Sequence, residues 1–329
     1  MDVLSDVIAV MRTGRPRSAL VRHHAPWARE FASAPGSAGL HVVLRGSCVL
    51  RPTAAATAQQ AVDAGPGDVV FVPRGTAHVL ADSPGTAVTA PPCEPGAPPR
   101  PAAGADRADG TGPATVLLCG AYRLDPQRTH PLLAALPDLV HLPAAPAGHQ
   151  EPTAAVRLLA GELERPRLGT DAIVPSLLDA LLLYVLRAWY GDAPLRGGRL
   201  ATGWAAALND PPVAAGLRAM HRTPAAPWTV ERLAREAGLS RAAFARRFTA
   251  LTGRPPLGYL TWWRMTLAAR LLSTSALPLA SVAAQVGYTS EFAFAHAFKR
   301  WCGTAPGRYR RAHPQDGPHR GRTSPTDGM

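Results

Sequence analysis

Two stretches in the C-terminal part of this sequence repeat each other at an offset of 49 to 50 residues. Each has the pattern of a short helix, a tight turn and a second helix. A compact unit of this type that occurs twice predicts a chain that grips double-stranded DNA at two points. The matching residues are Leu233, Ala234, Ala237, Gly238, Ser240, Phe244, Phe248, Gly253, Pro256 and Tyr259 in the first copy, and Val282, Ala283, Val286, Gly287, Ser290, Phe294, Phe298, Gly303, Pro306 and Tyr309 in the second.

Helix geometry explains why each copy forms this unit. Val230, Leu233 and Ala234 recur at helical spacing and give the first helix of the first copy one apolar face. Gly238 follows, and because glycine adopts a positive φ angle without steric cost, the chain can turn sharply there. Ser240 can then cap the second helix by accepting from a free backbone N–H. The phenylalanines of the repeat form the buried stripe of that second helix.

The opposite face of each second helix is left free for a partner, and we predict that it contacts DNA. Small side chains and guanidinium groups in the first copy suit close entry into a major groove. The second copy carries different side chains, so the two helices are expected to read different base edges. The predicted DNA-contacting residues are Ser240, Arg241, Ala242, Ala245 and Arg246 in the first copy, and Ser290, Glu291, Phe292, Ala295, His296 and Lys299 in the second.

The distribution of charge supports DNA binding independently of the repeat. Residues 221–311 hold 14 Arg and Lys and three acidic residues, a balance of +11. Residues 1–220 hold 19 Arg and 18 acidic residues, a balance of +1, and the tail from residue 312 balances at zero. Nearly all of the net charge of +12 therefore lies on the repeated region, as expected of a phosphate-binding module.

Length and composition limit the remaining possibilities. A chain of 329 residues is long enough for two domains, each with its own core. The four cysteines are scattered without a C-x-x-C pair, which argues against a zinc finger and favours a reducing cytosol. The N-terminus lacks the pattern of a signal peptide, and the apolar run 180–186 is far shorter than the ~20 residues that span a bilayer. We therefore expect a cytoplasmic protein with no membrane partner.

The N-terminal region, 1–195, has the character of a β-domain. Short segments rich in valine and leucine alternate with turn residues and predict an antiparallel sheet or barrel. Segment 84–113 is rich in Pro, Gly and Ala without periodicity, which predicts a disordered loop. The predicted strands are 19–24, 40–45, 48–51, 68–72 and 115–121, and the predicted helices that follow are 131–136, 153–164 and 171–190.

The helix predicted at 171–190 has an apolar stripe too wide for one small core contact. Two interpretations stay open: the helix is buried in a larger core, or it forms a subunit interface. The second would make the protein a homodimer through its N-terminal half. After it we expect a linker at 196–204, the DNA-binding domain at 205–312 and a disordered tail at 313–329.

The C-terminal hundred residues, with WTVERLAREAGLSRAAFARRFTALTGRPPLGYL and SVAAQVGYTSEFAFAHAFKRWCGTAPGRYRR, resemble the DNA-binding domain of the AraC/XylS family of bacterial transcription regulators. The resemblance implies two helix-turn-helix units joined by a long helix, here 256–272, whose second helices enter adjacent major-groove segments. It also implies contact with promoter DNA and with RNA polymerase. The base-facing positions that it implies are Ala242, Ala245, Arg246, Glu291, Phe292 and His296.

The segment GPGDVVFVPRGTAHVL in the N-terminal region resembles the second cupin motif, with Gly67, Pro73, Gly75 and His78 in place. The fold class implied is α+β multidomain: a cupin-like antiparallel β-barrel with following helices, then an all-α tandem helix-turn-helix domain. Metal-binding cupins also carry an earlier H-x-H…E motif, which this sequence lacks, so two histidines do not complete a metal site. We predict no metal and no cofactor, and a small-molecule effector near His41, Val43, Phe71 and His78.

Three functions remain compatible with this sequence. The favoured one is a transcription regulator, an activator or a repressor, whose barrel binds an effector and whose C-terminal domain binds a promoter. The second is a cupin metalloenzyme with an appended DNA-binding module, and the missing H-x-H…E motif counts against it. The third is an architectural DNA-binding protein in which the barrel only dimerises. We therefore predict a protein that is not an enzyme and has no catalytic residues.

Overall fold

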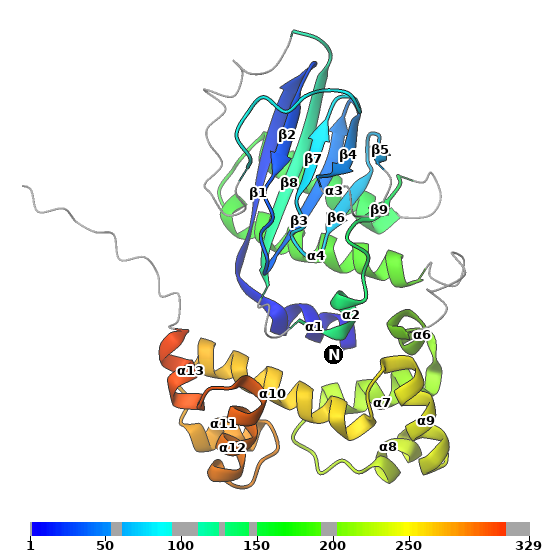
Figure 1. Cartoon of the computed structure of the whole chain (residues 1–329), viewed down its shortest axis with the longest axis vertical. Coiled ribbons are helices and arrows are strands. Elements are labelled where there is room, and N and C mark those ends of the chain that lie inside the picture. Colours follow the sequence, from blue (N-terminus) through cyan, green and yellow to red (C-terminus); the bar gives the residue numbers. More distant parts are fainter. Residues whose placement is uncertain are drawn as a thin grey trace, which may run out of the picture.

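The computed structural model describes residues 2–53, 61–93, 111–124, 129–144, 150–191 and 203–313. A β-rich N-terminal domain stands above a helical C-terminal domain (Figure 1). Much of the predicted loop at 84–113, nearly all of the predicted linker at 196–204 and all but the first residue of the predicted tail lie outside the described residues.

Two antiparallel sheets face each other in the N-terminal domain. The first has the strand order β1-β8-β3-β6-β9 and the second β2-β7-β4-β5. Each of the five predicted strands is present, and four short strands and a first helix were not predicted from the sequence. The strands are β1 (Arg12–His24), β2 (Ala28–Phe31), β3 (Ser37–Arg45), β4 (Cys48–Pro52), β5 (Val62–Ala64), β6 (Val69–Val72), β7 (His78–Ala81), β8 (Ala114–Leu124) and β9 (Val140–Leu142).

Alternation along the central strands separates two apolar clusters. Val43 of β3 lies opposite Leu117 of β8, and both belong to the cluster between the two sheets. Leu40 and Leu118 point to the other face of the first sheet, where they join the larger core formed with the helices. Because side chains on a strand point alternately to the two faces, this sheet is buried on both sides.

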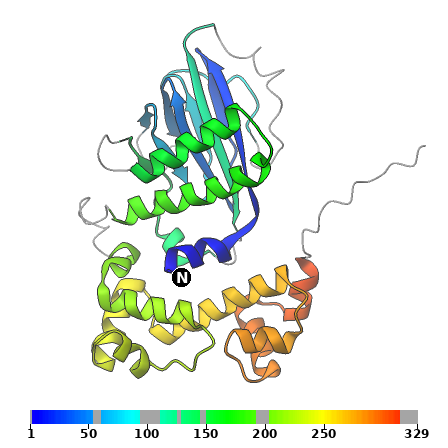
Figure 2. The ribbon, with the colours of Figure 1, turned by 180° about the vertical axis from the view of Figure 1, so that it is seen from behind.

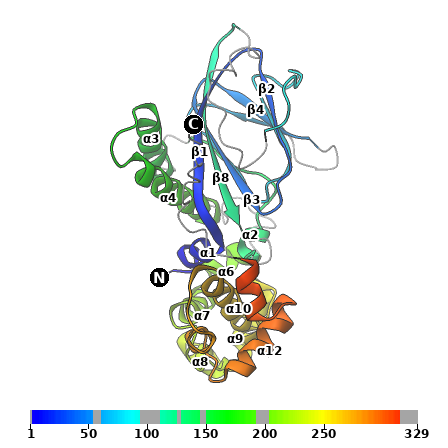
Figure 3. The ribbon, with the colours of Figure 1, turned by 90° about the vertical axis from the view of Figure 1, so that its left-hand side faces the viewer.

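Helices cover the outer face of the first sheet and the end of the N-terminal domain nearest the C-terminal domain. Two long helices lie side by side across that outer face (Figure 2), on the side away from β2 and β4 (Figure 3). A first helix and a short second helix lie between the sheets and the C-terminal domain (Figure 3). These four helices are α1 (Val3–Met11), α2 (Pro131–Ala134), α3 (Gln150–Glu164) and α4 (Thr170–Gly191).

The apolar stripe of α4 is used inside the protomer. Leu178 and Leu182 are almost fully buried against the sheet, and the Tyr122 hydroxyl of β8 donates to the Leu178 carbonyl at 2.6 Å. Of the two interpretations of this helix, burial in a larger core is therefore the one that the structure bears out for these leucines. α4 is also long and apolar enough to cross a membrane by length and composition alone, a test that core helices of soluble proteins pass as well.

The C-terminal domain consists of two helical units on a shared long helix. α10 runs along the top of the domain, with the first unit at one end and the second at the other (Figure 1). It extends two residues beyond the predicted 256–272. The first helix of the domain begins at Gly203, so the last two residues of the predicted linker 196–204 belong to this helix and the predicted start at 205 lies within it. The helices are α6 (Gly203–Asn209), α7 (Pro211–Arg222), α8 (Val230–Glu236), α9 (Arg241–Thr252), α10 (Pro256–Thr274), α11 (Leu279–Gln285), α12 (Glu291–Cys302) and α13 (Pro306–Ala312).

Candidate nucleic-acid interface

Glycine makes the turn in each helix-turn-helix unit. Gly238 between α8 and α9 has a φ of 65°, and Gly287 between α11 and α12 has a φ of 82°. A Cβ at Gly287 would also lie 2.9 Å from the Ala225 carbonyl oxygen, so this position is restricted by space as well as by conformation. The turns predicted from the sequence are thus the turns that the structure forms.

Both second helices begin with the predicted serine cap. The Ser240 hydroxyl accepts from the Ala243 N–H at 3.3 Å, and the Ser290 hydroxyl accepts from the Ala293 N–H at the same distance. The hydroxyls therefore satisfy backbone groups that α9 and α12 leave free at their N-termini. Contact of these serines with DNA stays a prediction.

Aromatic packing holds each second helix with its other face outward. Phe244 and Phe248 of α9 are fully buried, as are Phe294 and Phe298 of α12. α7 approaches α9 so closely that a Cβ at Gly216 would lie 2.6 Å from the Phe244 ring, so only glycine fits there. This packing fixes which residues of each helix face the solvent.

The outer face of α9 carries three arginines in different environments. Arg241 pairs with Glu231 of α8 at 2.7 Å, and the Arg247 Nε donates to Asp210, the cap of α7, at 2.7 Å. Arg246 is exposed, and within residues 203–313 it has no ion-pair partner within 4.0 Å, Glu236 included. Its guanidinium is therefore the one on this face that is free to bind an added ligand. Ala242 is exposed beside it, and Ala245 is half-buried.

The outer face of α12 has a different chemistry. Phe292 is 88% exposed, which is unusual for a phenylalanine in a folded protein. Glu291, His296 and Lys299 are also exposed, and Ala295 is half-buried. α12 thus offers an apolar ring, an imidazole and a lysine, where α9 offers a free guanidinium and methyl groups.

In the N-terminal domain the structure brings two of the predicted effector residues into direct contact. His41 of β3 and His78 of β7 lie with their Nε2 atoms 2.8 Å apart, between the two sheets. The ring of Phe31 stacks on His78 with a centroid distance of 4.8 Å.

The other two predicted effector residues, Val43 and Phe71, lie in different cores. Val43 belongs to the cluster between the two sheets. Phe71 does not: it belongs to the core beneath the helices, because Val70 takes the inward position on β6. The prediction that Phe71 lines the barrel interior is wrong.

Hydrogen bonding fixes the tautomers of the two histidines. The Nδ1–H of His78 donates to the Thr76 carbonyl at 2.8 Å, so the Nε2 of His78 accepts from the Nε2–H of His41. The Nδ1 of His41 then faces the Cys119 thiol at 3.3 Å as an acceptor. Burial lowers the pKa of both histidines, and for His41 the neighbouring His78 lowers it further. Both imidazoles are therefore neutral at physiological pH.

This arrangement does not fit the metal site of catalytic cupins. His41 turns one ring nitrogen to His78 and the opposite one to Cys119, so the three side chains do not converge on one point. Among the described residues no three His, Cys, Asp or Glu side chains are grouped to hold an ion. A catalytic metal site ordinarily needs three protein ligands, and His41, His78 and Cys119 do not supply them at one point.

Comparison with known proteins agrees with both domains. The Cupin family model matches residues 2–191, and the Helix-turn-helix domain model matches residues 233–312. An AraC-like transcription regulator of Streptomyces antibioticus is 35% identical over 320 residues, which are 95% of this chain and 99% of that protein. A regulator of the same description from Streptomyces lividans is 36% identical over 315 residues, 95% of this chain and 99% of that protein.

Among solved structures, the chain is similar to the DNA-binding domain of AdpA in complex with a target DNA, with 38% identity, 31% of this chain and 92% of that chain covered, and a TM-score of 0.30. ToxT from Vibrio cholerae O395 covers 91% of this chain and 98% of its own at 10% identity and a TM-score of 0.34. The sequence relatives at 35% and 36% identity extend over both domains. The chain therefore belongs to the AraC-like DNA-binding transcription regulators that carry a cupin-like N-terminal domain.

Proposed function

We propose that this regulator reads its operator with the exposed faces of α9 and α12 and responds to a small-molecule effector bound by its N-terminal domain. The observation that carries the proposal is the pair of capped, outward-facing second helices on a domain with a charge balance of +11 over residues 221–311. Phosphate attraction supplies affinity, and the two different outer faces supply sequence preference.

Base readout is divided between the two helices. Arg246 can form a bidentate contact with guanine O6 and N7, and Ala242 and Ala245 can contact thymine methyl groups. On α12, the exposed Phe292 ring suits thymine methyl groups and the His296 imidazole can donate to a base edge. Few of these side chains form hydrogen bonds, so DNA shape contributes to the preference as well.

The effector occupies the space between the two sheets beside His41, His78 and Val43. Both imidazoles are buried, and the Phe31 ring packs against each of them. A ligand that separates the pair would replace their mutual hydrogen bond and displace the Phe31 ring. Small barrels commonly hold ligands in this position, with a few polar groups in an apolar lining.

A ligand screen by thermal shift tests this site. An effector at a hundredfold excess over its dissociation constant stabilises the protein by about 2.7 kcal/mol. His78→Ala should reduce that stabilisation. His141→Ala, which removes a histidine of the same domain that pairs with Asp68 at 3.0 Å, should leave it unchanged. Equal stabilisation of the His78→Ala variant and the parent would place the effector elsewhere.

The protein acts as a homodimer through the turn between α3 and α4. Leu178 and Leu182 of the apolar stripe of α4 are buried within the protomer, so a subunit contact of this helix must use other side chains. Three other apolar side chains of this helix pair are exposed instead: Leu158 of α3, Leu168 between the two helices and Ile173 of α4, which are 59%, 103% and 41% exposed. Exposed apolar side chains that form a patch mark protein contacts.

Charge substitutions in this patch test the dimer. Ile173→Glu or Leu158→Glu should convert a dimer into a folded monomer, measured by sedimentation equilibrium. Leu257→Glu on α10, which alters a leucine that is 39% exposed and distant in sequence, is the matched control and should remain dimeric. A parent chain that is monomeric at high micromolar concentration would rule out this interface.

As a cytoplasmic activator, the DNA-bound dimer would contact RNA polymerase at the promoter. The cupin-like domain serves as a sensor and not as an enzyme, since His41 and His78 are engaged with each other and His41 also with Cys119. Selection of bound sequences from a random DNA pool tests the proposed function as a whole. Recovery of one enriched operator supports it, and retention of all sequences alike contradicts it.

A further inference from the structure

A chain of buried side-chain hydrogen bonds joins the two domains. Asp6 of α1 and His130, the cap of α2, come from the N-terminal domain, and His221 of α7 and Tyr259 of α10 come from the C-terminal domain. The Tyr259 hydroxyl lies 2.9 Å from the His130 Nε2 and 2.6 Å from the His221 Nε2. The His221 Nδ1 lies 3.3 Å from the Asp6 carboxylate. The chain therefore crosses the domain boundary twice.

The position of every proton in this chain of hydrogen bonds follows from the bond that the His130 Nδ1 accepts. The Leu132 N–H donates to the His130 Nδ1 at 2.9 Å, so a neutral His130 carries its proton on Nε2 and donates to Tyr259. The Tyr259 hydroxyl then donates to the His221 Nε2, and the His221 Nδ1–H donates to the Asp6 carboxylate. Each donor has one acceptor and each acceptor one donor, so the hydrogen bonds have a single direction from α2 to α1.

Because the four hydrogen-bonded side chains are buried, the loss of any one of them leaves a buried partner unsatisfied. His130 and Tyr259 are 0% exposed, and the side chains of His221 and Asp6 are 0% and 4% exposed. Burial also lowers the pKa of both histidines and raises that of Tyr259, which keeps all three groups neutral. A buried polar group without its partner is costly, because water cannot replace the lost hydrogen bond. Separation of the domains would leave several such groups unsatisfied at once.

Aromatic rings surround the chain and come mainly from the C-terminal domain. His221 stacks on Trp263 with a centroid distance of 4.1 Å, and His130 meets the edges of Trp204 and Trp262 at 4.8 and 5.1 Å. His130 is thus inserted into an aromatic cage of the other domain. Apolar packing alone tolerates sliding, whereas directed hydrogen bonds inside such a cage permit one orientation.

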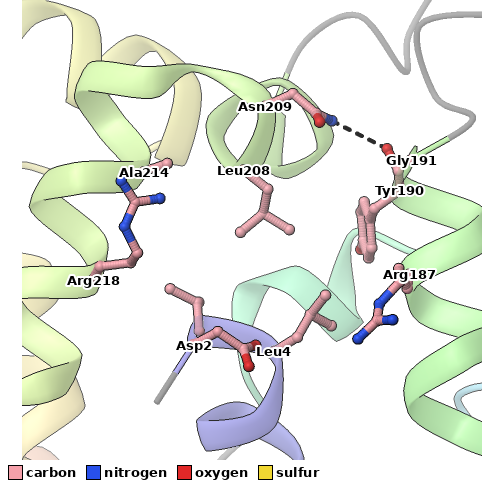
Figure 4. A pocket seen from close by; sticks show the side chains of 10 residues that line it. Asp2, Leu4, Arg187, Tyr190, Gly191, Leu208, Asn209, Ala214 and Arg218 are labelled. Carbon is pink, nitrogen blue, oxygen red and sulfur yellow. Dashed lines mark hydrogen bonds between the residues drawn. The ribbon is translucent and has the colours of Figure 1, made fainter.

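A pocket of about 250 Å³, partly open to solvent, lies at the domain boundary between α1, α4, α6 and α7 (Figure 4). Val3, Leu4, Tyr190 and Leu208 are among the residues that line it. Its wall reaches Asp2, whose carbonyl accepts from the Asp6 N–H one helical turn away. The pocket therefore lies one helical turn of α1 from Asp6.

We propose that Asp6, His221, Tyr259 and His130 form an interdomain latch that fixes the DNA-binding domain in one orientation on the sensor domain. Tyr259 is the central residue of the latch, because its hydroxyl is the only atom of the latch that bonds to both histidines. The latch holds the end of α10 that carries the first helix-turn-helix unit and leaves both outer faces exposed. Its opening leaves the DNA-binding domain free to reorient on the sensor domain.

The first experiment removes one oxygen atom from the full-length chain. Tyr259→Phe should increase the radius of gyration in small-angle scattering and split one cooperative thermal transition into two. The matched control is Tyr122→Phe, which removes an equally buried hydroxyl whose bond to Leu178 stays within the sensor domain. That variant should melt at a lower temperature, in one transition, with an unchanged radius. Tyr259→Phe with the same radius and a single transition would overturn the latch.

The second experiment opens the latch from the sensor side, where packing of the DNA-binding domain is untouched. Asp6→Ala removes the acceptor of the His221 Nδ1–H and should reproduce the expanded, two-transition behaviour of Tyr259→Phe. Asp6→Asn keeps a carbonyl oxygen at that place and should retain most of the parent behaviour. If Asp6→Ala stays compact while Tyr259→Phe expands, the contact of His221 with Asp6 does not hold the domains together and the four-residue latch is refuted.

The third experiment concerns DNA and rests on the proposed function, since it needs a dimer. Two rigidly held DNA-binding domains accept paired half-sites at one spacing, and released domains accept several. In selection from a random pool, the parent should enrich pairs at one spacing, and Tyr259→Phe should enrich the same half-site at varied spacings. Equal spacing preference in both would contradict the latch. Single half-sites from the parent would refute the dimer, and the scattering and melting results would still decide the latch.

Discussion

The two helix-turn-helix units share a sequence pattern but not a structural setting. Phe244 and Phe248 of the first unit belong to one apolar core that continues through α10 into the sensor domain. Phe294 and Phe298 of the second unit belong to a separate core. The boundary falls within α10, where Trp263 packs with the first core and Met265 with the second. A repeat in sequence has therefore become an asymmetric pair, in which the core of one unit continues into the sensor domain and the core of the other does not.

The largest expected effect comes from replacing one buried phenylalanine in each core by alanine. Phe248→Ala and Phe298→Ala each remove a fully buried ring and should destabilise the surrounding core by about 3 to 5 kcal/mol. Hydrogen exchange should show that Phe248→Ala reduces protection in the sensor helices as well as in α8 and α9. Phe298→Ala should affect α11, α12 and α13 only. If both variants lost protection from hydrogen exchange over the same helices, the two cores would not be separate.

The next largest effect is on DNA binding, and it distinguishes Arg246 from Arg241 on α9. Arg246→Ala should cost about 1 to 3 kcal/mol on the preferred operator and relax the preference at one base pair. Arg241→Ala is the matched control, because Arg241 already pairs with Glu231. It should weaken binding less and leave every base preference in place. If Arg246→Ala instead weakens all sequences alike and reduces the salt slope by about one unit, Arg246 contacts a phosphate.

The smallest effect at neutral pH is the dependence of stability on protonation. Burial lowers the pKa of His41, His78, His130 and His221 in the folded state, all in or beside the sensor domain. The unfolded chain, with a histidine pKa near 6.5, therefore binds more protons than the folded one below that pH. The free energy of unfolding should have its full value above about pH 6.5 and should decrease as the pH is lowered below that value.

This pH effect should also divide the two units. The described second core holds no buried histidine, so protection of α11 and α12 should change little between pH 7 and pH 5.5. Protection of the sensor domain and the first unit should decrease over the same range. A double substitution, His130→Gln with His221→Gln, should flatten part of that decrease. An identical pH response of both units would show that the histidines do not determine it.

The repeat was predictable because it depends on local chemistry. Glycine at a turn, serine at a cap and phenylalanine at helical spacing act within a few residues, so Gly238, Ser240 and Phe244 could be assigned from the sequence. The longer strands were predictable for the same reason. Short strands such as β5 and β9 carry too few residues for an alternating pattern, and their positions depend on the neighbours with which they pair.

The contacts between distant segments were not predictable. Nothing near His130 in the sequence indicates that it meets Tyr259, 129 residues away, and Asp6 and His221 are separated by 215 residues. Phe71 was assigned to the wrong face because β6 is apolar at each of its positions, so alternation could not be read. The interpretation of α4 stayed open for a similar reason, since an apolar stripe does not reveal which surface covers it.

The most direct test of the account is operator selection by the full-length protein, repeated with Arg246→Ala and with His296→Ala. The account predicts a bipartite motif whose two parts lie in successive major-groove segments, about one helical turn or 10 base pairs apart. Arg246→Ala should relax preference in one part only, and His296→Ala in the other only. A motif with a single part, or loss of both parts through either substitution, would contradict the claim that α9 and α12 read the operator separately.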